Sequence, residues 1–173
     1  MKEFGGQPLF LDRSDINTDE IIPAKYLTEN SKEALKTHIL EDLHLESFDP
    51  QNDIAGKNII VTRSNFGCGS SREHAVWVFE VNDINVVIAE SFARIFRQNM
   101  FNCGMLAIEL PKEDINSLFS LEVGTTITVD LEHDLVSAVN DQGFSLSIPF
   151  SMNEFDRDLV LAGGWLAYAD QKY

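Results

Sequence analysis

Apolar residues in the middle of this chain gather in short runs that alternate with helix-like segments. Three runs are rich in Ile, Val and Leu: 58–62, 84–89 and 105–110. Runs of this kind are typical of strands that are buried on both faces of a sheet. The segments between them predict helices, at 75–80 and 93–101. The order strand–helix–strand–helix–strand predicts parallel strands joined by right-handed crossovers.

The C-terminal part of the chain has a different pattern. Residues 125–131 alternate between apolar and polar, which predicts a half-buried strand. Two further β-type runs, 135–139 and 144–148, flank a turn sequence and predict a hairpin. Residues 152–162 predict a helix that ends at a glycine pair. We therefore expect a single α/β domain over residues 1–173, with a mixed sheet that has a parallel strand–helix–strand core and an antiparallel β section.

The N-terminal part is less regular. Residues 9–11 form a short apolar run, and the polar stretch 12–20 that follows predicts a long loop. Loops of this length are uncommon unless they are functional or disordered. Residues 31–45 predict a helix, because their apolar residues fall on one helical face and Asn30 or Ser31 can cap it.

Composition excludes several classes of partner. The net charge of −15 argues against nucleic acid, which requires clustered Lys and Arg. No apolar run approaches the roughly 20 residues that span a bilayer, and the N-terminal residues lack the apolar core of a signal peptide. The 2 cysteines lie far apart in the sequence and form no disulfide framework. We expect a cytoplasmic protein with reduced thiols.

The segment 65–75 carries the most specific chemistry. It follows the first apolar run, contains Gly67 and Gly69, and continues with Ser70, Ser71 and Arg72 before a predicted helix. Glycines permit a tight turn, a helix N-terminus attracts anions, and an arginine can bind a carboxylate through two hydrogen bonds. These features predict an anion site. The alternative is a purely structural helix start, with a serine as N-cap and Glu73 completing a capping box.

Other candidate residues give weaker signals. His74 is either a base near Ser70 or a packed residue at the helix start. Cys68 and Cys103 lack the spacing and the number of ligands that a zinc site or an iron–sulfur cluster requires, so we expect no metal bound by this chain. The carboxylates of the 12–20 stretch lack the spacing of a calcium loop. Arg94 and Arg97, one helical turn apart, either face the anion site or pair with surface carboxylates.

Three segments together resemble the swivel domain of the aconitase superfamily: 17–27, 65–75 and 91–96. The length and the order of these segments are similar to those of 3-isopropylmalate dehydratase (isopropylmalate isomerase) small subunits, and the resemblance covers nearly the whole chain. It implies a swivelling β/β/α domain. It also implies a separate large subunit that carries a [4Fe-4S] cluster, so that the active site is shared between two chains.

The resemblance assigns roles to individual residues. Ser70 is implied to be the catalytic base that accepts a proton from carbon, while Ser71 and Arg72 hold a substrate carboxylate. Asp19 is implied to support the site. A serine is a weak base, so these roles require strong electrostatic preorganisation around the hydroxyl. The cluster of the partner is implied to act as a Lewis acid on the leaving hydroxyl.

Substrate choice is implied to depend on the loop after Tyr26 and Leu27. Tricarboxylate enzymes of the superfamily carry an arginine there and isopropylmalate enzymes carry apolar residues, whereas this chain has Thr28 and Glu29. The first hypothesis is interconversion of 2-isopropylmalate and 3-isopropylmalate, by dehydration and rehydration, in leucine biosynthesis. The alternatives are the small subunit of a homoaconitase or of another substituted-malate dehydratase, and a non-catalytic anion-binding regulatory module.

Overall fold

A four-stranded parallel sheet forms the centre of the protein. The computed structural model describes residues 1–121 and 124–173. The strands follow the order β2-β3-β4-β5 and are all parallel. Their bounds are Pro8–Leu11, Ile59–Thr62, Val86–Ala89 and Leu106–Glu109. Every residue of β3 and β4 is buried, which confirms the interpretation of the apolar runs as strands covered on both faces.

Helices cover one face of this sheet, as the sequential strand order requires for right-handed crossovers. The predicted helices 75–80 and 93–101 are observed as α4 (His74–Val81) and α5 (Arg94–Asn102). Shorter elements fill the long connection between β2 and β3. These are α1 (Thr18–Ile21), the 3-10 helix η1 (Ala24–Tyr26), α2 (Lys32–Leu35), the 3-10 helix η2 (Lys36–His38) and α3 (Pro50–Asp53).

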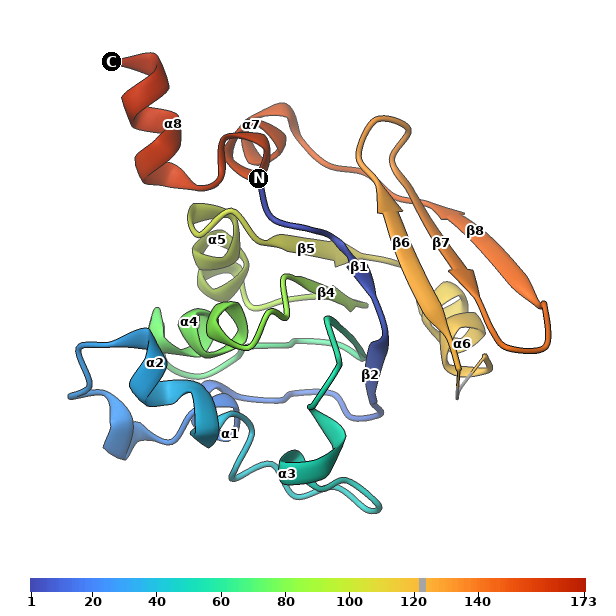
Figure 1. Cartoon of the computed structure of the whole chain (residues 1–173), viewed down its shortest axis with the longest axis horizontal. Coiled ribbons are helices and arrows are strands. Elements are labelled where there is room, and N and C mark those ends of the chain that lie inside the picture. The colour runs from blue at the N-terminus through green and yellow to red at the C-terminus, as the bar shows by residue number, and fades with distance from the viewer. Residues whose placement is uncertain (122–123) are drawn as a thin grey trace.

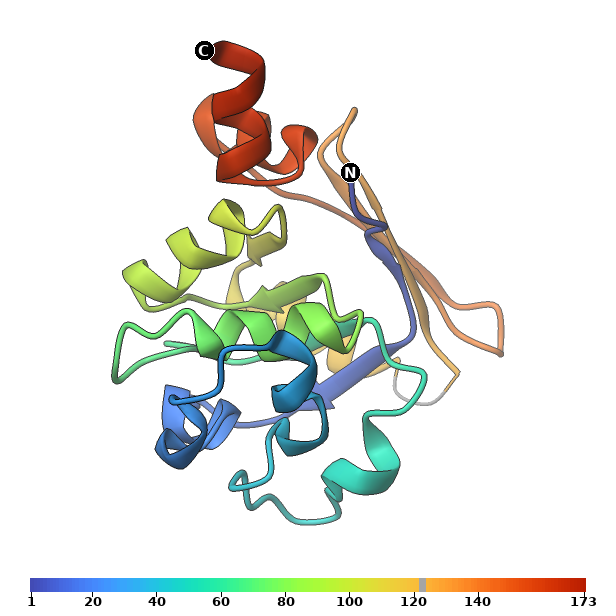
Figure 2. The ribbon, with the colours of Figure 1, turned by 60° about the vertical axis from the view of Figure 1, so that its left-hand side comes forward.

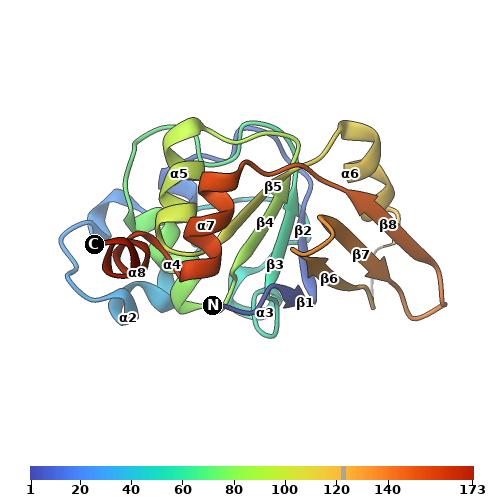
Figure 3. The same cartoon turned by 90° about the horizontal axis from the view of Figure 1, so that it is seen from above.

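An antiparallel sheet lies on the other side of the parallel sheet (Figure 3). Its order is β1-β6-β7-β8, and its strands are Gly5–Gly6, Thr126–Asp130, Leu135–Val139 and Ser145–Pro149. Its buried side chains, Ile127, Val136, Ala138 and Ile148, belong to the common core. The α/β fold is confirmed, with its parallel and antiparallel sections as two separate sheets in a β/β/α arrangement.

Three helices follow the parallel strands. The helix α6 (Lys112–Phe119), which the sequence pattern did not reveal, contributes Phe119 to a ring contact with Phe10 at 5.3 Å between centroids. The predicted C-terminal helix is α7 (Glu154–Ala162), which Gly163 ends in a left-handed conformation. A further helix, α8 (Trp165–Lys172), stands clear of both sheets (Figure 1, Figure 2).

The predicted helix over 31–45 is wrong beyond His38. The chain leaves the helical conformation at Ile39, and Leu40 takes a positive φ of 54°. This bend lets the Leu40 N–H donate to the carbonyl of Ile21 at 2.8 Å. Leu35, Ile39, Leu40 and Leu43 are buried, so the apolar stripe predicts burial correctly but not the backbone that achieves it.

Among the residues that the structure describes, no helix has the length and apolar character needed to cross a membrane.

Candidate active site

The segments that follow β2 and β3 meet at one edge of the parallel sheet. Parallel neighbours end at the same edge, so the residues after Leu11 and after Thr62 leave the sheet side by side. Three backbone hydrogen bonds join the two segments: from Asp15 to Ser64 (2.9 Å), from Gly67 to Ile16 (2.8 Å) and from Thr18 to Cys68 (2.8 Å). The backbone pairing of the two strands is thus continued into the loops, which holds the two loop segments together.

A third segment, after β4, supports the same turn. The backbone N–H of Asn65 donates to the Ser91 hydroxyl at 2.8 Å, and the N–H of Ala93 donates to the carbonyl of Phe66 at 3.0 Å. The ring of Phe66 is buried against Phe96, with centroids 5.4 Å apart. Ser91 therefore stabilises the turn, a role that its position in the sequence did not reveal.

Two glycines shape the turn itself. Gly67 has φ +82°, and a Cβ at this position would lie 2.2 Å from Cγ of Phe96. Gly69 has φ +100°, and a Cβ there would lie 3.2 Å from the Thr18 hydroxyl oxygen. Both positions require a left-handed conformation and a close approach, for which glycine is the suitable residue.

The turn brings together Ser70, Arg72 and Asp19, which we call the Ser70 cluster. The guanidinium of Arg72 donates from Nη1 to Asp19 Oδ1 at 2.6 Å and from Nη2 to Ser70 Oγ at 3.2 Å. The Arg72 side chain is 12% exposed and that of Asp19 is 63% exposed. A cation that donates to a hydroxyl oxygen favours negative charge on that oxygen, so this geometry suits a serine that accepts a proton.

The position of Ser70 is fixed from below by a buried threonine. The backbone N–H of Ser70 donates to Thr18 Oγ1 at 3.1 Å, and Thr18 is 2% exposed. Ser70 and Ser71 themselves are exposed. The backbone of the cluster is thus anchored on the buried Thr18, which is its inner side. The exposed residues Ser70 and Ser71 form its open outer side.

The alternative reading of the two serines as helix caps is wrong. The helix α4 begins at His74, its N-cap is Glu73, and no side chain caps it. Ser70 instead lies in the preceding turn, within hydrogen-bonding distance of Arg72.

Thr28 is not part of the Ser70 cluster, but the loop that carries it contacts the start of α4. It is exposed, in the loop that follows η1. The next residue, Glu29, accepts a hydrogen bond through its carbonyl oxygen from His74 Nε2 at 3.2 Å. His74 also packs its ring against Trp77, with centroids 4.7 Å apart. The structure therefore favours the packed role for His74 over that of a base.

A capping box holds the short helix α1 under the site. The Asn17 side chain accepts from the N–H of Glu20 at 2.9 Å, and the Glu20 carboxylate accepts from the N–H of Asn17 at 3.1 Å. Arg13 forms a hydrogen-bonded ion pair with the same carboxylate. This hydrogen bond from Arg13 lowers the pKa of Glu20. The spacing of Asn17 and Glu20 was a signal for this helix start that the loop interpretation missed.

The remaining candidates are not members of the Ser70 cluster. Arg97 pairs with Glu109 at 3.9 Å and stacks over Phe101, which fits the surface-pairing alternative. Burial raises the pKa of Cys68, and burial raises that of Cys103 to about 11. Cys103 packs against the apolar core.

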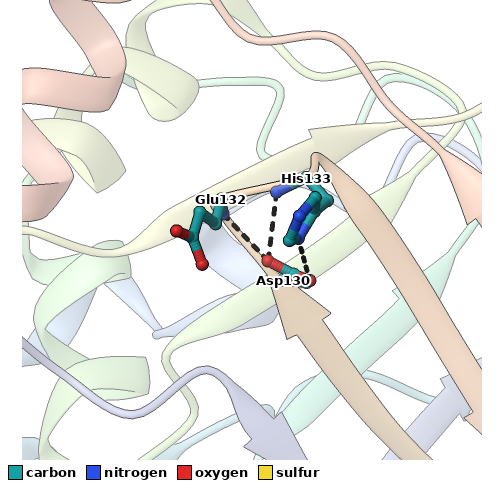
Figure 4. Close-up of side chains that lie close together, drawn as sticks. All are labelled: Asp130, Glu132 and His133. Atoms are coloured by element: carbon teal, nitrogen blue, oxygen red, sulfur yellow. Dashed lines mark hydrogen bonds and ion pairs between the residues drawn. The ribbon is translucent and has the colours of Figure 1, made fainter.

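One group of metal-type ligands lies in the turn between β6 and β7 (Figure 4). There the Asp130 carboxylate accepts from the backbone N–H groups of Glu132 and His133 at 2.9 and 3.1 Å. The second carboxylate oxygen lies 2.8 Å from His133 Nδ1. These bonds close the turn, which accounts for the grouping.

Comparison with known proteins identifies the family. The model of the Aconitase C-terminal domain matches residues 13–113. A 3-isopropylmalate dehydratase small subunit of Pseudoalteromonas translucida is 37% identical over 162 residues, which cover 87% of this chain and 81% of that protein. One of Novosphingobium aromaticivorans is 36% identical over 176 residues, which cover 98% of this chain and 86% of that protein. The chain belongs to the family of 3-isopropylmalate dehydratase small subunits.

A solved structure in the family agrees with the fold. The crystal structure of 3-isopropylmalate dehydratase from Methanocaldococcus jannaschii has a TM-score of 0.76 and 30% sequence identity. The match covers 97% of this small-subunit chain and 93% of the other. The resemblance to the aconitase superfamily is thereby confirmed. The roles of Ser70, Ser71, Arg72, Thr28 and Asp19 stay predictions.

Proposed function

We propose that this chain is the small subunit of a heteromeric hydro-lyase that interconverts 2-isopropylmalate and 3-isopropylmalate in leucine biosynthesis. The observation that carries the proposal is the Ser70 cluster, where a guanidinium joins a carboxylate and an exposed hydroxyl. The names of the relatives support this choice of reaction, because they are 3-isopropylmalate dehydratase small subunits.

In this proposal Ser70 handles the proton of the reaction. Dehydration removes a proton from one substrate carbon and the hydroxyl from its neighbour, and rehydration adds water back with the two positions exchanged. Ser70 Oγ accepts the proton from carbon, and the Arg72 guanidinium 3.2 Å away offsets the negative charge that the oxygen carries before the transfer.

Substrate binding is assigned to the other polar groups. Arg72 has five N–H donors, and its bonds to Asp19 and Ser70 leave others to meet a substrate carboxylate. Ser71, exposed beside it, contributes a further hydroxyl. Asp19 keeps the guanidinium in position. Thr28 is assigned to the side of the pocket that selects the substituent of the malate.

The proposal places the [4Fe-4S] cluster in a separate large subunit. Cys68 and Cys103 are free thiols with raised pKa values, and two thiols do not fit a group that requires three or four thiolates. The open outer side of the Ser70 cluster supports a shared site, since Ser70 and Ser71 are exposed in this chain alone. The large subunit would cover this side.

The test is co-expression with the large subunit and anaerobic assay of hydroxy-diacids and hydroxy-triacids. We expect turnover of 2- and 3-isopropylmalate. Turnover only of a hydroxytricarboxylate would favour a homoaconitase, and turnover of a malate with a smaller substituent would favour another dehydratase. No turnover of any substrate, with anion binding retained, would favour the regulatory module.

Replacement of Ser70 tests the role of the base. We expect Ser70→Ala to lower kcat by at least about 10²-fold, the usual contribution of a positioned base, and Arg72→Lys to abolish measurable turnover. Ser147→Ala is the matched control, because Ser147 is exposed on β8 in the other sheet. Thermal unfolding of each variant checks that the fold is kept. Near-normal turnover by Ser70→Ala would remove Ser70 as the base.

A further inference from the structure

The loop formed by residues 26–31, here called the Tyr26 loop, has two exposed side chains and contacts the first residue of α4 through Glu29. Leu27 and Thr28 are exposed at its centre. The loop is not helical after η1, yet it is held at several points by groups from other elements. The contacts that hold it determine where Leu27 and Thr28 stand relative to the Ser70 cluster.

The beginning of the loop is fixed by a stacked ring. The Tyr26 ring lies parallel to the His38 ring at 3.9 Å between centroids, and its hydroxyl donates to Glu41 at 3.0 Å. His38 Nδ1 lies 2.7 Å from the other oxygen of the same carboxylate. Three side chains therefore tie the start of the loop to the segment after α2.

The end of the loop is fixed to α4. Ser31 caps α2 by accepting from the Glu33 N–H at 3.2 Å. The Lys32 ammonium lies 2.5 Å from the Glu80 carboxylate of α4 and over the ring of Trp77. The end of the Tyr26 loop is therefore held against α4, the helix that begins at His74.

His74 ties the centre of the loop to the same helix. A carbonyl oxygen only accepts hydrogen bonds, so the 3.2 Å contact requires that His74 Nε2 donates to Glu29. Trp77 fixes the plane of the imidazole. Because His74 follows Arg72 by one intervening residue, this bond couples the backbone next to Thr28 to the backbone that carries the guanidinium.

We propose that His74 is a positioning residue that sets the location of Thr28 relative to Arg72 and thereby selects the substrate. The inference rests on the proposed function of the Ser70 cluster. His74 acts through the loop, to which its Nε2–H is hydrogen-bonded at the Glu29 carbonyl. Loss of this bond weakens the fit of the substrate substituent and leaves the proton transfer at Ser70 in place.

Two variants and one control test the proposal. His74→Leu removes the donor, whereas His74→Gln keeps an N–H at the end of a side chain of comparable reach. His133→Leu is the matched control, because His133 also has a ring nitrogen in contact with a neighbouring oxygen but lies in the β6–β7 turn (Figure 4).

The first measurement is amide hydrogen exchange in the chain alone. The Leu27 N–H donates to the carbonyl of Ala24 in η1, and the Glu29 N–H donates to the carbonyl of Tyr26, at 3.1 Å each. We expect His74→Leu to speed their exchange about tenfold, as loss of one hydrogen bond allows, and His74→Gln to restore most of the protection. Unchanged exchange in His74→Leu would show that the hydrogen bond from His74 to Glu29 does not hold the loop, whatever reaction the complex catalyses.

The second measurement is steady-state kinetics of the complex with the large subunit, on 3-isopropylmalate and on 2-methylmalate. For His74→Leu we expect KM for 3-isopropylmalate to rise about tenfold, with kcat within about twofold of wild type and a reduced preference over 2-methylmalate. A lowered kcat with unchanged KM would overturn the role in substrate selection. A wild-type complex without turnover would overturn the proposed function and this role with it, while the exchange result would still stand for the loop.

Discussion

Alanine at position 67 would place a methyl group within the ring of Phe96, because an added Cβ lies 2.2 Å from Cγ. The φ of +82° adds a backbone cost for any residue with a side chain. We expect Gly67→Ala to lower the free energy of unfolding by about 3 kcal/mol, the sum of overpacking and left-handed strain. Urea unfolding measures this value.

Gly56→Ala separates the two contributions. Gly56 has φ +78°, and nothing lies within 4 Å of an added Cβ, so only the backbone cost applies. We expect a loss of about 1 kcal/mol there. Equal losses at both positions would show that Phe96 moves aside without cost.

For single residues, the sequence predicted the location of residues within one segment better than it predicted hydrogen bonds between segments. Ser70, Ser71 and Arg72 follow each other after a strand, so their position at the sheet edge could be inferred from the order of elements. The support of Ser70 by Thr18 joins residues that are 52 positions apart, and no local pattern reports such a contact. Thr18 was therefore missed, although it is buried directly below the site.

The stability of the short helix α1 depends on the charge of Glu20. The hydrogen bond from Arg13 lowers the pKa of Glu20 in the folded chain, so the pair stabilises the fold above the usual carboxyl pKa, and this stabilisation is lost as the pH falls through the folded value. We expect Glu20→Gln to cost about 1 kcal/mol at pH 7. The difference from wild type should shrink toward zero in acid, as measured by urea unfolding at several pH values.

The pH dependence of the difference distinguishes this explanation from simple loss of the cap. Glutamine retains an oxygen for the Asn17 N–H, so a capping effect alone would give a small difference that does not change with pH. A difference that stays constant from pH 7 into acid would contradict the role of the ion pair.

The elements themselves were predictable where their pattern was unambiguous. The strands and helices predicted between 58 and 110 match α4, α5 and three strands closely, because their burial dictates their composition. The helix predicted over 31–45 failed because Leu40 bends the chain to reach the Ile21 carbonyl, and tertiary contacts override a helical stripe.

For the whole molecule, the order of strands predicted parallel pairing with right-handed crossovers, whereas the β/β/α arrangement was implied only by the family resemblance. The alternation over residues 125–131 predicted a half-buried strand, and in the structure Ile127 pairs with Ala138, both of them buried. No local pattern in the sequence indicates that the antiparallel sheet faces the parallel one. That arrangement arises because both sheets have apolar faces that must be buried against each other.

The proposed sharing of the active site with a large subunit predicts the behaviour of the isolated chain. We expect the purified small subunit to contain no stoichiometric iron and to show no turnover, because its donors do not suit a cluster and its Ser70 cluster is open. Metal analysis and an anaerobic assay before and after addition of the large subunit measure both properties. Stoichiometric iron in the chain purified alone would contradict the proposed division between subunits.

The ion pair between Asp19 and Arg72 joins positions that are 53 residues apart. During synthesis, the first partner therefore leaves the ribosome long before the second, and the pair cannot form until the intervening connection has closed as a loop. The Asp19–Arg72 contact therefore depends on closure of a long-range loop and not on local structure. A companion protein that recognised this contact would bind only chains in which that connection has folded.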